Sequence, residues 1–273
     1  MKMIMFKNML AVCIIAGLFQ SCSSSNITNE EGLKKFFDEN KVEGTFALYN
    51  NGQGNFNIYN LSRYKDSAYL PASTFKIVNS LIGLQTGRIT NTKMQMKWDG
   101  IDRGMPEWNK DLTMEEAFKV SCVPYYQEVA RRIGKDTMQS WLDSLSYGTK
   151  KITTKIDTFW LDNSLKIKPD EQMGLVKKLY FGQLPFSKTT MENVRKVMIQ
   201  ENNSNYTLAY KTGLGYKENG KKLAWIVGWI EENKHPSFFV LNFEGEKDID
   251  MVNVRKTILT NCLKTLGYMQ GKK

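Results

Sequence analysis

Two stretches near the start of the chain alternate apolar and polar residues. They are Thr45 to Tyr49 and Asn55 to Tyr59, and the turn-forming run Asn51-Gly52-Gln53-Gly54 separates them. Alternation with a period of two, interrupted by a glycine-rich turn, predicts a β-hairpin. Three further apolar runs in the last third of the chain predict strands at Leu208 to Lys211, Leu223 to Ile230 and Phe238 to Phe243.

Between these two groups of strands the apolar residues recur at helical spacing. The first predicted helix begins near Ser73 and is mostly buried, and Gly87 provides its end. A closing helix is predicted from about Met251 to Leu266. The other predicted helices cover Met114 to Phe118, Tyr125 to Ile133, Met138 to Leu145, Met173 to Tyr180 and Met191 to Ile199.

Strands at both ends and helices in the middle predict an α/β fold of the α+β type. We expect a central antiparallel sheet built from both chain termini, flanked by helices, with an inserted all-helical lobe. Residues 36–273 would form a single catalytic domain, with an α/β lobe at about 36–72 and 204–273 and a helical lobe at about 73–203. A site in such a protein commonly lies in the cleft between its lobes.

The first 21 residues have the pattern of an export signal. Lys2 and Lys7 precede an apolar run from Met9 to Phe19 that is too short for a permanent membrane span. The following residues, Leu18 to Cys22, resemble a bacterial lipoprotein cleavage site with Cys22 as the lipid-modified first residue, although Gln20 stands where a small residue is usual. We therefore expect a signal peptide at 1–21, a tether at 22–35 and a periplasm-facing lipoprotein held to the membrane by its lipid. The alternative is a plain signal peptide and a soluble periplasmic protein.

The composition is that of a globular protein, with 273 residues, 41% hydrophobic and 24% charged. Removal of the signal peptide takes away two lysines and no acids, so the formal charge falls from +10 to +8. The lysines are scattered pairs without an arginine-rich run, so we expect no nucleic acid partner. A basic surface favours anionic small substrates or an anionic membrane. The sequence leaves open whether the protein is a monomer or a homodimer.

The cysteines and the single histidine limit which metal sites, disulfides and catalytic bases the chain can form. Cys13 leaves with the signal peptide and Cys22 would carry the lipid, which leaves Cys122 and Cys262 in the folded part. The sequence therefore shows no disulfide framework or zinc pattern, and either one disulfide or two free thiols is compatible with it. His235 is the only histidine and stands before Pro236 in a polar segment between two apolar runs, which predicts an exposed hairpin turn. A serine hydrolase of this sequence therefore needs a base other than histidine, and we expect no metal.

Ser73-Thr74-Phe75-Lys76 offers such a nucleophile and base. Residues three apart lie on one face of a helix, so the Ser73 hydroxyl and the Lys76 amine are predicted to meet. A free lysine has a pKa of about 10.4, so the site must lower the pKa of Lys76 or convert its amine chemically. The spacing alone is weak evidence, because Ser-x-x-Lys occurs by chance in most chains of this length.

Several other short sequence fragments accompany the Ser-x-x-Lys motif along the chain. In this order and spacing they resemble the class D serine β-lactamases, the OXA-type enzymes, over roughly residues 40 to 268. The resemblance implies the penicillin-binding-protein and β-lactamase transpeptidase-like fold. The fragments are Pro71 to Lys76, Lys97-Trp98-Asp99-Gly100, Asp111-Leu112-Thr113, Ser121-Cys122-Val123, Tyr147-Gly148-Thr149, Phe159-Trp160-Leu161, Lys211-Thr212-Gly213, Ala224-Trp225 to Val227-Gly228-Trp229, and Arg255-Lys256.

The resemblance implies hydrolysis of the amide bond of β-lactam antibiotics, most of all penicillins, through an acyl-enzyme on Ser73. Lys76 would take up CO2 from bicarbonate as a carbamate, N6-carboxylysine, and act as general base in acylation and deacylation. Carbamate formation needs a neutral amine, which apolar walls favour. Phe75, Val120, Val123 and Trp160 are available as walls, and the Trp160 indole N–H would hold a carbamate oxygen.

The remaining roles follow the same resemblance. Ser121 would pass a proton to the leaving nitrogen with Lys211 beside it, although Ser121 read alone is more often a helix cap. The substrate carboxylate would bind Thr212 and Arg255, and Gly213 would let the backbone come close. The oxyanion hole would use the N–H groups of Ser73 and Leu214. Leu161 would lie near the deacylation water, or would simply pack.

Thr149 departs from the family pattern, which has Asn after Tyr-Gly, so we expect an altered substrate preference.

Two other kinds of protein use the same Ser-x-x-Lys motif and are alternatives to a β-lactamase. One is a β-lactam sensor or penicillin-binding domain that is acylated without turnover. Such receptors carry membrane spans and an effector that we do not expect here. The other is a D-Ala-D-Ala peptidase, which the aromatic residues Phe75 and Trp160 disfavour.

Overall fold

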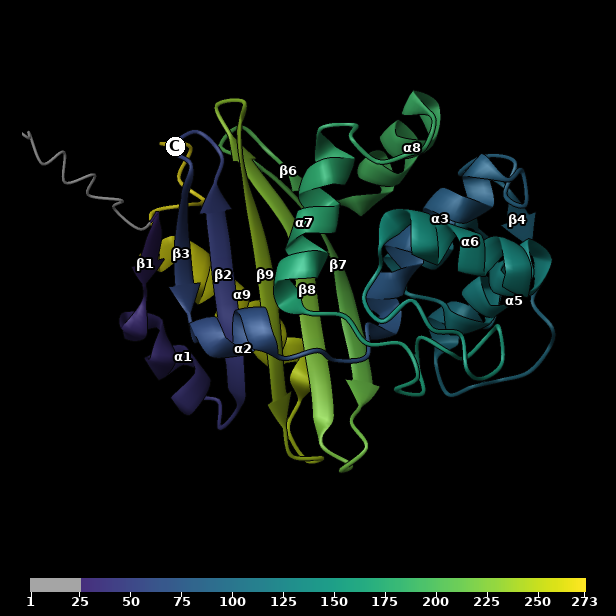
Figure 1. Cartoon of the computed structure of the whole chain (residues 1–273), viewed down its shortest axis with the longest axis horizontal. Coiled ribbons are helices and arrows are strands. Elements are labelled where there is room, and N and C mark those ends of the chain that lie inside the picture. The colour runs from purple at the N-terminus through teal and green to yellow at the C-terminus, as the bar shows by residue number, and fades with distance from the viewer. Residues whose placement is uncertain (1–25) are drawn as a thin grey trace, which may run out of the picture.

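A seven-stranded sheet forms the centre of the computed structural model, which describes residues 26–273 (Figure 1). The strand order is β1-β3-β2-β9-β8-β7-β6, so strands from the two ends of the chain lie side by side. All neighbours are antiparallel except β1 and β3. The strands are β1 Ile27–Asn29, β2 Glu43–Asn50, β3 Asn55–Tyr59, β6 Ile199–Asn202, β7 Thr207–Tyr216, β8 Lys222–Glu232 and β9 His235–Gly245.

Helices cover both faces of the sheet and form a second group beyond β7 (Figure 1). A small two-stranded sheet accompanies this second group of helices, and in it β4 Gln95–Met96 pairs with β5 Leu112–Thr113. The α-helices are α1 Lys34–Asp38, α2 Leu61–Asp66, α3 Lys76–Gln85, α4 Met114–Lys119, α5 Val123–Ile133, α6 Lys135–Leu145, α7 Pro169–Tyr180, α8 Lys188–Met198 and α9 Met251–Thr265. Short 3-10 turns are η1 Glu31–Leu33, η2 Ala72–Phe75 and η3 Pro106–Trp108.

Alternation along the strands divides the core in two. In β9, Phe239 and Leu241 face α1 and α9, whereas Phe238 and Val240 belong to the larger core on the opposite face. Both faces of the strand are apolar because both are covered by helices. The burial of these two apolar faces is the main term that stabilises the sheet.

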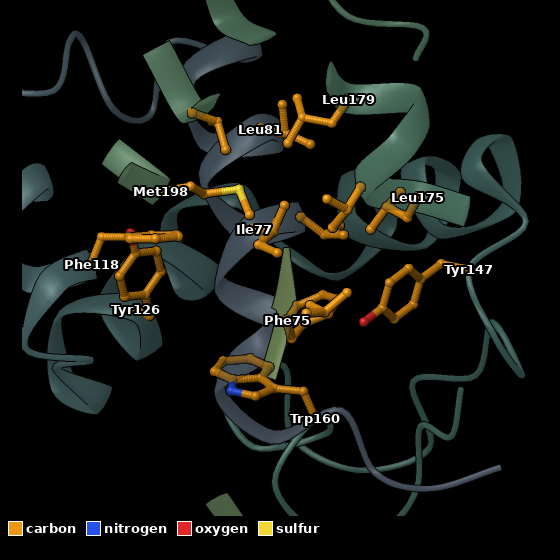
Figure 2. Close-up of a cluster of buried hydrophobic side chains, with 14 of the residues drawn as sticks. Phe75, Ile77, Leu81, Phe118, Tyr126, Tyr147, Trp160, Leu175, Leu179 and Met198 are labelled. Atoms are coloured by element: carbon orange, nitrogen blue, oxygen red, sulfur yellow. The ribbon is translucent and has the colours of Figure 1, made fainter. Parts of the chain in front are cut away.

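The larger core joins the sheet to the helical part of the chain. Helix α7 packs on β8 and β9, and α3 runs through the middle of the helices, in contact with α5 and α8. Figure 2 shows part of this cluster, in which Phe75 lies between Trp160 and Tyr147. The ring of Phe75 stacks on Trp160 at 5.4 Å and meets Tyr147 edge-on at 5.5 Å. The residue before Lys76 is therefore fixed by aromatic packing.

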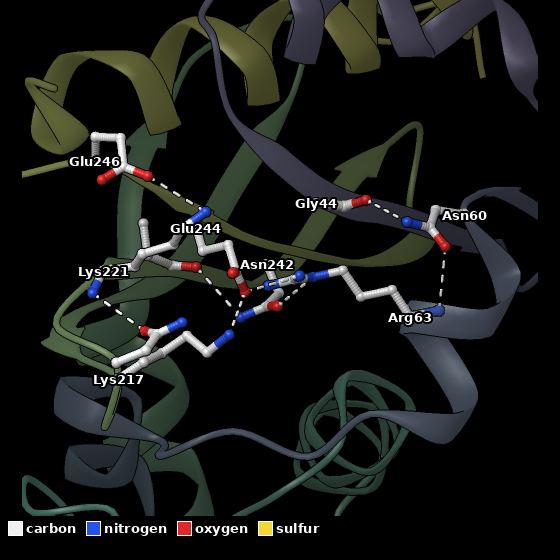
Figure 3. A network of polar contacts seen from close by, with 10 residues as sticks. Gly44, Asn60, Arg63, Lys217, Lys221, Asn242, Glu244 and Glu246 are labelled. Atoms are coloured by element: carbon white, nitrogen blue, oxygen red, sulfur yellow. Dashed lines mark hydrogen bonds and ion pairs between the residues drawn. The ribbon is translucent and has the colours of Figure 1, made fainter.

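A buried polar network ties α2 to the sheet (Figure 3). The Arg63 guanidinium donates to Asn242 Oδ1 at 3.0 Å and to Glu244 Oε2 at 3.1 Å. Lys217, in the hairpin between β7 and β8, donates to the same Glu244 oxygen at 2.7 Å. A buried carboxylate with two cationic donors is well compensated, so this network fixes the α2 segment and the β7–β8 hairpin against β9.

The predicted hairpin, the C-terminal strands and the helices are confirmed, and so is the antiparallel sheet built from both termini. The tether was predicted to extend to residue 35, but Ile27–Asn29 already pairs with β3 and α1 begins at Lys34. The reason is that Ile27 packs against the larger core. The lobe at 73–203 is not all helical, because it contains β4 and β5 and ends in β6. Helix α7 covers the sheet instead of belonging to the inserted lobe.

Candidate active site

Ser73 and Lys76 meet at the start of the buried helix α3. Residues Ala72–Phe75 form the 3-10 turn η2 and the α-helix begins at Lys76, slightly later than the sequence predicts. The Lys76 Nζ and Ser73 Oγ atoms lie 2.6 Å apart. Ala72 has a left-handed φ of 49°, and its N–H donates to the Trp160 carbonyl at 3.0 Å. A non-glycine residue in this conformation is strained, so the surrounding contacts hold the turn in place.

Aromatic rings surround the Lys76 amine. Its side chain is only 1% exposed, and the Tyr126 ring lies 5.5 Å from Nζ. Phe75 and Trp160 stack beside the same turn (Figure 2). Burial lowers the pKa of Lys76 to about 7, because the ammonium form loses its hydration in these surroundings. A substantial fraction of the amine is therefore neutral near pH 7, as a base or a carbamate precursor must be.

The Trp160 indole N–H is a buried donor that lacks a hydrogen-bond partner within residues 26–273. An unpaired buried donor is costly, so a ligand or water that paired with it would be favoured. Trp160 stacks on Phe75, the residue before Lys76, so this N–H is available to a polar group bound at the same turn. The buried neutral amine, the apolar walls and the free indole donor thus fit a carbamate on Lys76.

Ser121 and Lys211 form a second serine–lysine pair from distant parts of the chain. Lys211 lies on β7, is 3% exposed and donates from Nζ to Ser121 Oγ at 3.0 Å. Ser121 sits between α4 and α5 with a φ of 56°. Its reading as a helix cap is wrong, because Cys122 occupies the N-cap position of α5. Burial lowers the pKa of Lys211 well below its usual value, and the charges of Lys76 and Arg255 lower it further, so the two pairs belong to one site.

Strand β7 extends well beyond Ala209, the last of its residues that pairs with β6. β6 pairs only with Thr207 to Ala209, which leaves one edge of β7 open at Lys211 to Leu214. Gly213 is needed here for packing, since a Cβ atom would lie 3.0 Å from the Pro71 carbonyl oxygen. The absence of a side chain thus lets β7 approach the nucleophile turn.

Thr212 and Arg255 flank this open edge. The Arg255 guanidinium comes from α9 and donates from Nη1 to the Gly213 carbonyl at 3.3 Å, whereas its Nε atom is buried without a partner in the described chain. Leu214 is 40% exposed. An open strand edge beside an incompletely paired guanidinium can bind a planar anion.

A family model for the penicillin-binding-protein transpeptidase domain matches residues 34–264. β-Lactamase OXA-10 of Pseudomonas aeruginosa is 35% identical over 267 residues, which span 97% of this chain and 100% of that protein. The chain belongs to the class D serine β-lactamases. This membership identifies it as a hydrolase and confirms the predicted resemblance and the transpeptidase-like fold.

The solved structure of the class D β-lactamase from Sebaldella termitidis superposes on this class D enzyme with a TM-score of 0.85 and 33% identity, covering 90% of this chain and 100% of that one. The regulatory protein BlaR1 of Bacillus licheniformis is also similar. It is 33% identical over 217 residues, which cover 80% of this chain and 36% of BlaR1.

Two more residues named from the sequence lie at the edges of the site. Val123 is the first residue of α5 and is half-buried, and Leu161 is half-buried against the larger core beside Trp160. Thr149 is exposed and exchanges hydrogen bonds with the backbone of Lys166, accepting one through Oγ1 at 3.1 Å. Thr149 therefore holds two loop segments of the class D enzyme together.

The structure also places the residues that the sequence set aside. His235 is exposed at the start of β9, as predicted. Cys122 and Cys262 are both free and buried, which decides between the two alternatives. Within residues 26–273, no three His, Cys, Asp or Glu side chains are grouped so as to hold a metal ion. In the same range, no helix is long and apolar enough to cross a membrane. Cys22 lies outside the described residues.

Sequence reasoning missed the aromatic rings that contact the two lysines. Tyr126 lies over Lys76, and the Phe118 ring lies 5.4 Å from Lys211 Nζ. Trp225 was named only as part of a family fragment, without a role. Its indole N–H donates to the Leu70 carbonyl at 2.9 Å and so fixes the segment before the nucleophile. Aromatic residues in apolar runs have the pattern of ordinary core, so only the fold reveals their contact with charged groups.

Proposed function

We propose that this class D enzyme hydrolyses β-lactams, penicillins above all, through an acyl-enzyme on Ser73. The contact between Lys76 Nζ and Ser73 Oγ at 2.6 Å carries the proposal, because it joins a nucleophile to a buried amine with a lowered pKa. In acylation the bond from Ser73 Oγ to the lactam carbonyl carbon forms and the lactam C–N bond breaks. A water molecule then cleaves the ester and releases the opened acid.

Lys76 and Trp160 are the residues that would hold a CO2-derived carbamate. When bound, it supplies an oxygen base in place of the amine. The Trp160 indole N–H supports this assignment because it is buried and unpaired. Phe75 and Tyr126 exclude water from the amine and favour its neutral form. Val123 would be part of the apolar wall beside Lys76, and Leu161 would lie near the deacylation water.

The second pair would deliver the proton that the leaving nitrogen needs. The Ser121 hydroxyl would donate to the lactam nitrogen as the C–N bond breaks. Lys211, 3.0 Å from Ser121 Oγ, would stabilise the charge that develops on that oxygen. Ser121 would regain a proton from the base at Lys76 that took the Ser73 proton, so the net result is transfer of one proton from Ser73 to the ring nitrogen and the site returns to its starting charge.

The open edge of β7 would position the substrate. The backbone N–H groups of Ser73 and Leu214 would form the oxyanion hole. Thr212 and Arg255 would bind the substrate carboxylate. Two observations support this arrangement. Arg255 Nε is unpaired within the described residues, and Leu214 on β7 is exposed. Thr149 would affect substrate preference only indirectly, through the loop contact with Lys166.

Multiple turnover is the decisive test. The purified protein, incubated with nitrocefin and with benzylpenicillin in bicarbonate buffer, should release many product molecules per enzyme. Removal of CO2 should slow the reaction reversibly. A Ser73→Ala variant is the control and should show neither turnover nor a covalent adduct by mass spectrometry. The absence of turnover in bicarbonate would contradict the proposal.

Similarity to BlaR1 supports a second candidate, a β-lactam sensor or penicillin-binding domain that stays acylated. The same assay separates the two functions. A single burst followed by a stable mass increase on Ser73 would favour the sensor, and continued turnover would exclude it. Release of D-alanine from a peptide ending in D-Ala-D-Ala would instead favour a cell-wall peptidase.

We also propose export and attachment to the membrane through a lipid on Cys22, with the catalytic domain facing the periplasm. The cleavage pattern before Cys22 supports this proposal. A Cys22→Ala variant should leave the membrane fraction, and its persistence there would contradict the lipid anchor. Sedimentation of the soluble form would decide between a monomer and a homodimer.

A further inference from the structure

A small cavity lies at the open edge of β7 and includes the proposed carboxylate site, Thr212 and Arg255, in its wall. It has a volume of about 150 Å³ and is bounded by the end of α4, by β6 and β7, and by the first turns of α9. A water molecule needs about 10–15 Å³ of such space, so the cavity can admit a polar group of several atoms. We call it the β7-edge cavity. Its lining residues are Phe118, Lys119, Gln200, Tyr210, Lys211, Thr212, Val252, Arg255 and Lys256.

Four of the lining side chains are basic and none is acidic. They are Lys119, Lys211, Arg255 and Lys256, and none of the four forms an ion pair with an acid of residues 26–273. Lys211 is buried and Arg255 is half-buried, whereas Lys119 and Lys256 are exposed at the rim. Four other cavities of the described chain each have at least one acidic side chain in their lining, so the absence of an acid distinguishes this cavity.

In the proposed function a single substrate carboxylate would neutralise only part of the positive charge around this cavity. One carboxylate on Thr212 and Arg255 would leave Lys119 and Lys256 without a partner. Lys211 and Arg255 also lie close enough for the charge of Arg255 to lower the pKa of Lys211. A second negative charge in the cavity would therefore relieve repulsion among the cations as well as gain attraction to the rim lysines.

We propose that the β7-edge cavity binds a second anionic group of the substrate, so that the enzyme favours dianionic β-lactams. This inference rests on the proposed function. In a cephalosporin the carbon next to the one that bears the ring carboxylate carries a variable substituent. With the carboxylate on Thr212 and Arg255, the proposal places an anion on that substituent in the same cavity, which Lys119 and Lys256 also line.

A matched pair of cephalosporins provides the test. Cefonicid and cefamandole share the ring, the carboxylate and the acyl side chain. They differ in that the tetrazole of cefonicid carries a sulfomethyl group where cefamandole has methyl. Their inhibition constants in competition with nitrocefin, at low ionic strength, should differ by about tenfold in favour of cefonicid, because each hydrogen bond to a charged group contributes strongly.

The variant Lys119→Gln/Lys256→Gln should reduce this ratio to near one. The matched control is Lys264→Gln, which removes an exposed lysine further along the same helix α9 and should keep the ratio. Raising the ionic strength to about 0.5 M should also shrink the ratio, because exposed charges are screened.

The outcomes separate the two proposals. Equal inhibition constants in the wild-type protein, or a preference for cefonicid that survives in the double variant, would overturn the inference. Nitrocefin that is not turned over would instead contradict the proposed function. In that case calorimetric titration of Ser73→Ala with both cephalosporins still measures the preference without any catalytic step.

Discussion

The site contains two serine–lysine pairs that look alike and differ in their surroundings. Lys76 and Lys211 are both buried, and each lies within hydrogen-bond distance of a serine hydroxyl, Ser73 and Ser121 respectively. Lys76 is enclosed by aromatic rings beside an unpaired indole N–H. Lys211 lies at an open strand edge beside further cations. Burial is the main cause of the lowered pKa of both amines, and neighbouring cations lower the pKa of Lys211 further. We therefore propose that the first lysine acts as a base and that the second, together with its cationic neighbours, binds anions.

The largest effect should follow removal of the base. Lys76→Ala should slow acylation of Ser73 about a thousandfold or more, because general base catalysis commonly contributes about 10²–10⁴. The rate of covalent mass increase with benzylpenicillin measures this step. Ser73→Ala, which can form no adduct, sets the background. Acylation at the wild-type rate would show that Lys76 is not the base.

The second pair should matter somewhat less for the chemistry. Lys211→Ala should lower kcat/KM by about 10²-fold or more, since it removes a buried charge that serves both proton transfer and anion binding. Ser121→Ala should lower kcat with a smaller effect on KM, because its hydroxyl would act only on the leaving nitrogen. Steady-state kinetics with nitrocefin separates the two effects. Equal changes in KM for both variants would contradict the division of roles.

The unpaired indole offers a finer test of the first pair. Trp160→Phe keeps an aromatic ring against Phe75 but removes the N–H donor. We expect a loss of about 10–100-fold in deacylation, as for the loss of a charge-assisted hydrogen bond. The acyl-enzyme should accumulate by mass, and added bicarbonate should partly restore turnover. Trp225→Phe removes another buried indole N–H, one that is already paired with Leu70, and is the matched control. Wild-type turnover of Trp160→Phe in CO2-free buffer would exclude this role.

The smallest effect concerns pH. Because burial lowers the pKa of Lys76 to about 7, the amine is mostly protonated at pH 6 and mostly neutral at pH 8. Recovery of activity after CO2 is removed and restored should therefore be about tenfold faster at pH 8 than at pH 6, in proportion to the neutral amine. The rate of recovery in bicarbonate buffers of equal CO2 content measures this difference. A rate that rises toward low pH would contradict the assignment.

The sequence predicted most of the fold because its elements have strong local patterns. The hairpin of β2 and β3 and the run of helices follow from periods of two and 3.6 residues. The tether was wrong because Ile27–Asn29 is too short and too polar to show a strand pattern, and only its partner β3 fixes it. Likewise, nothing local distinguishes α7, which covers the sheet, from the helices that surround α3.

By itself, the sequence determined the pairing of Ser73 with Lys76, because residues three apart in one helical turn meet whatever surrounds them. The sequence alone also indicated that the general base is not histidine, because the single histidine is predicted to lie in an exposed turn. The tertiary structure decided the rest, since burial and long-range contacts combine segments that no local pattern connects. It brought Ser121 to Lys211 across 90 residues, left the Trp160 N–H free, and gathered Lys119 and Lys256 around one cavity.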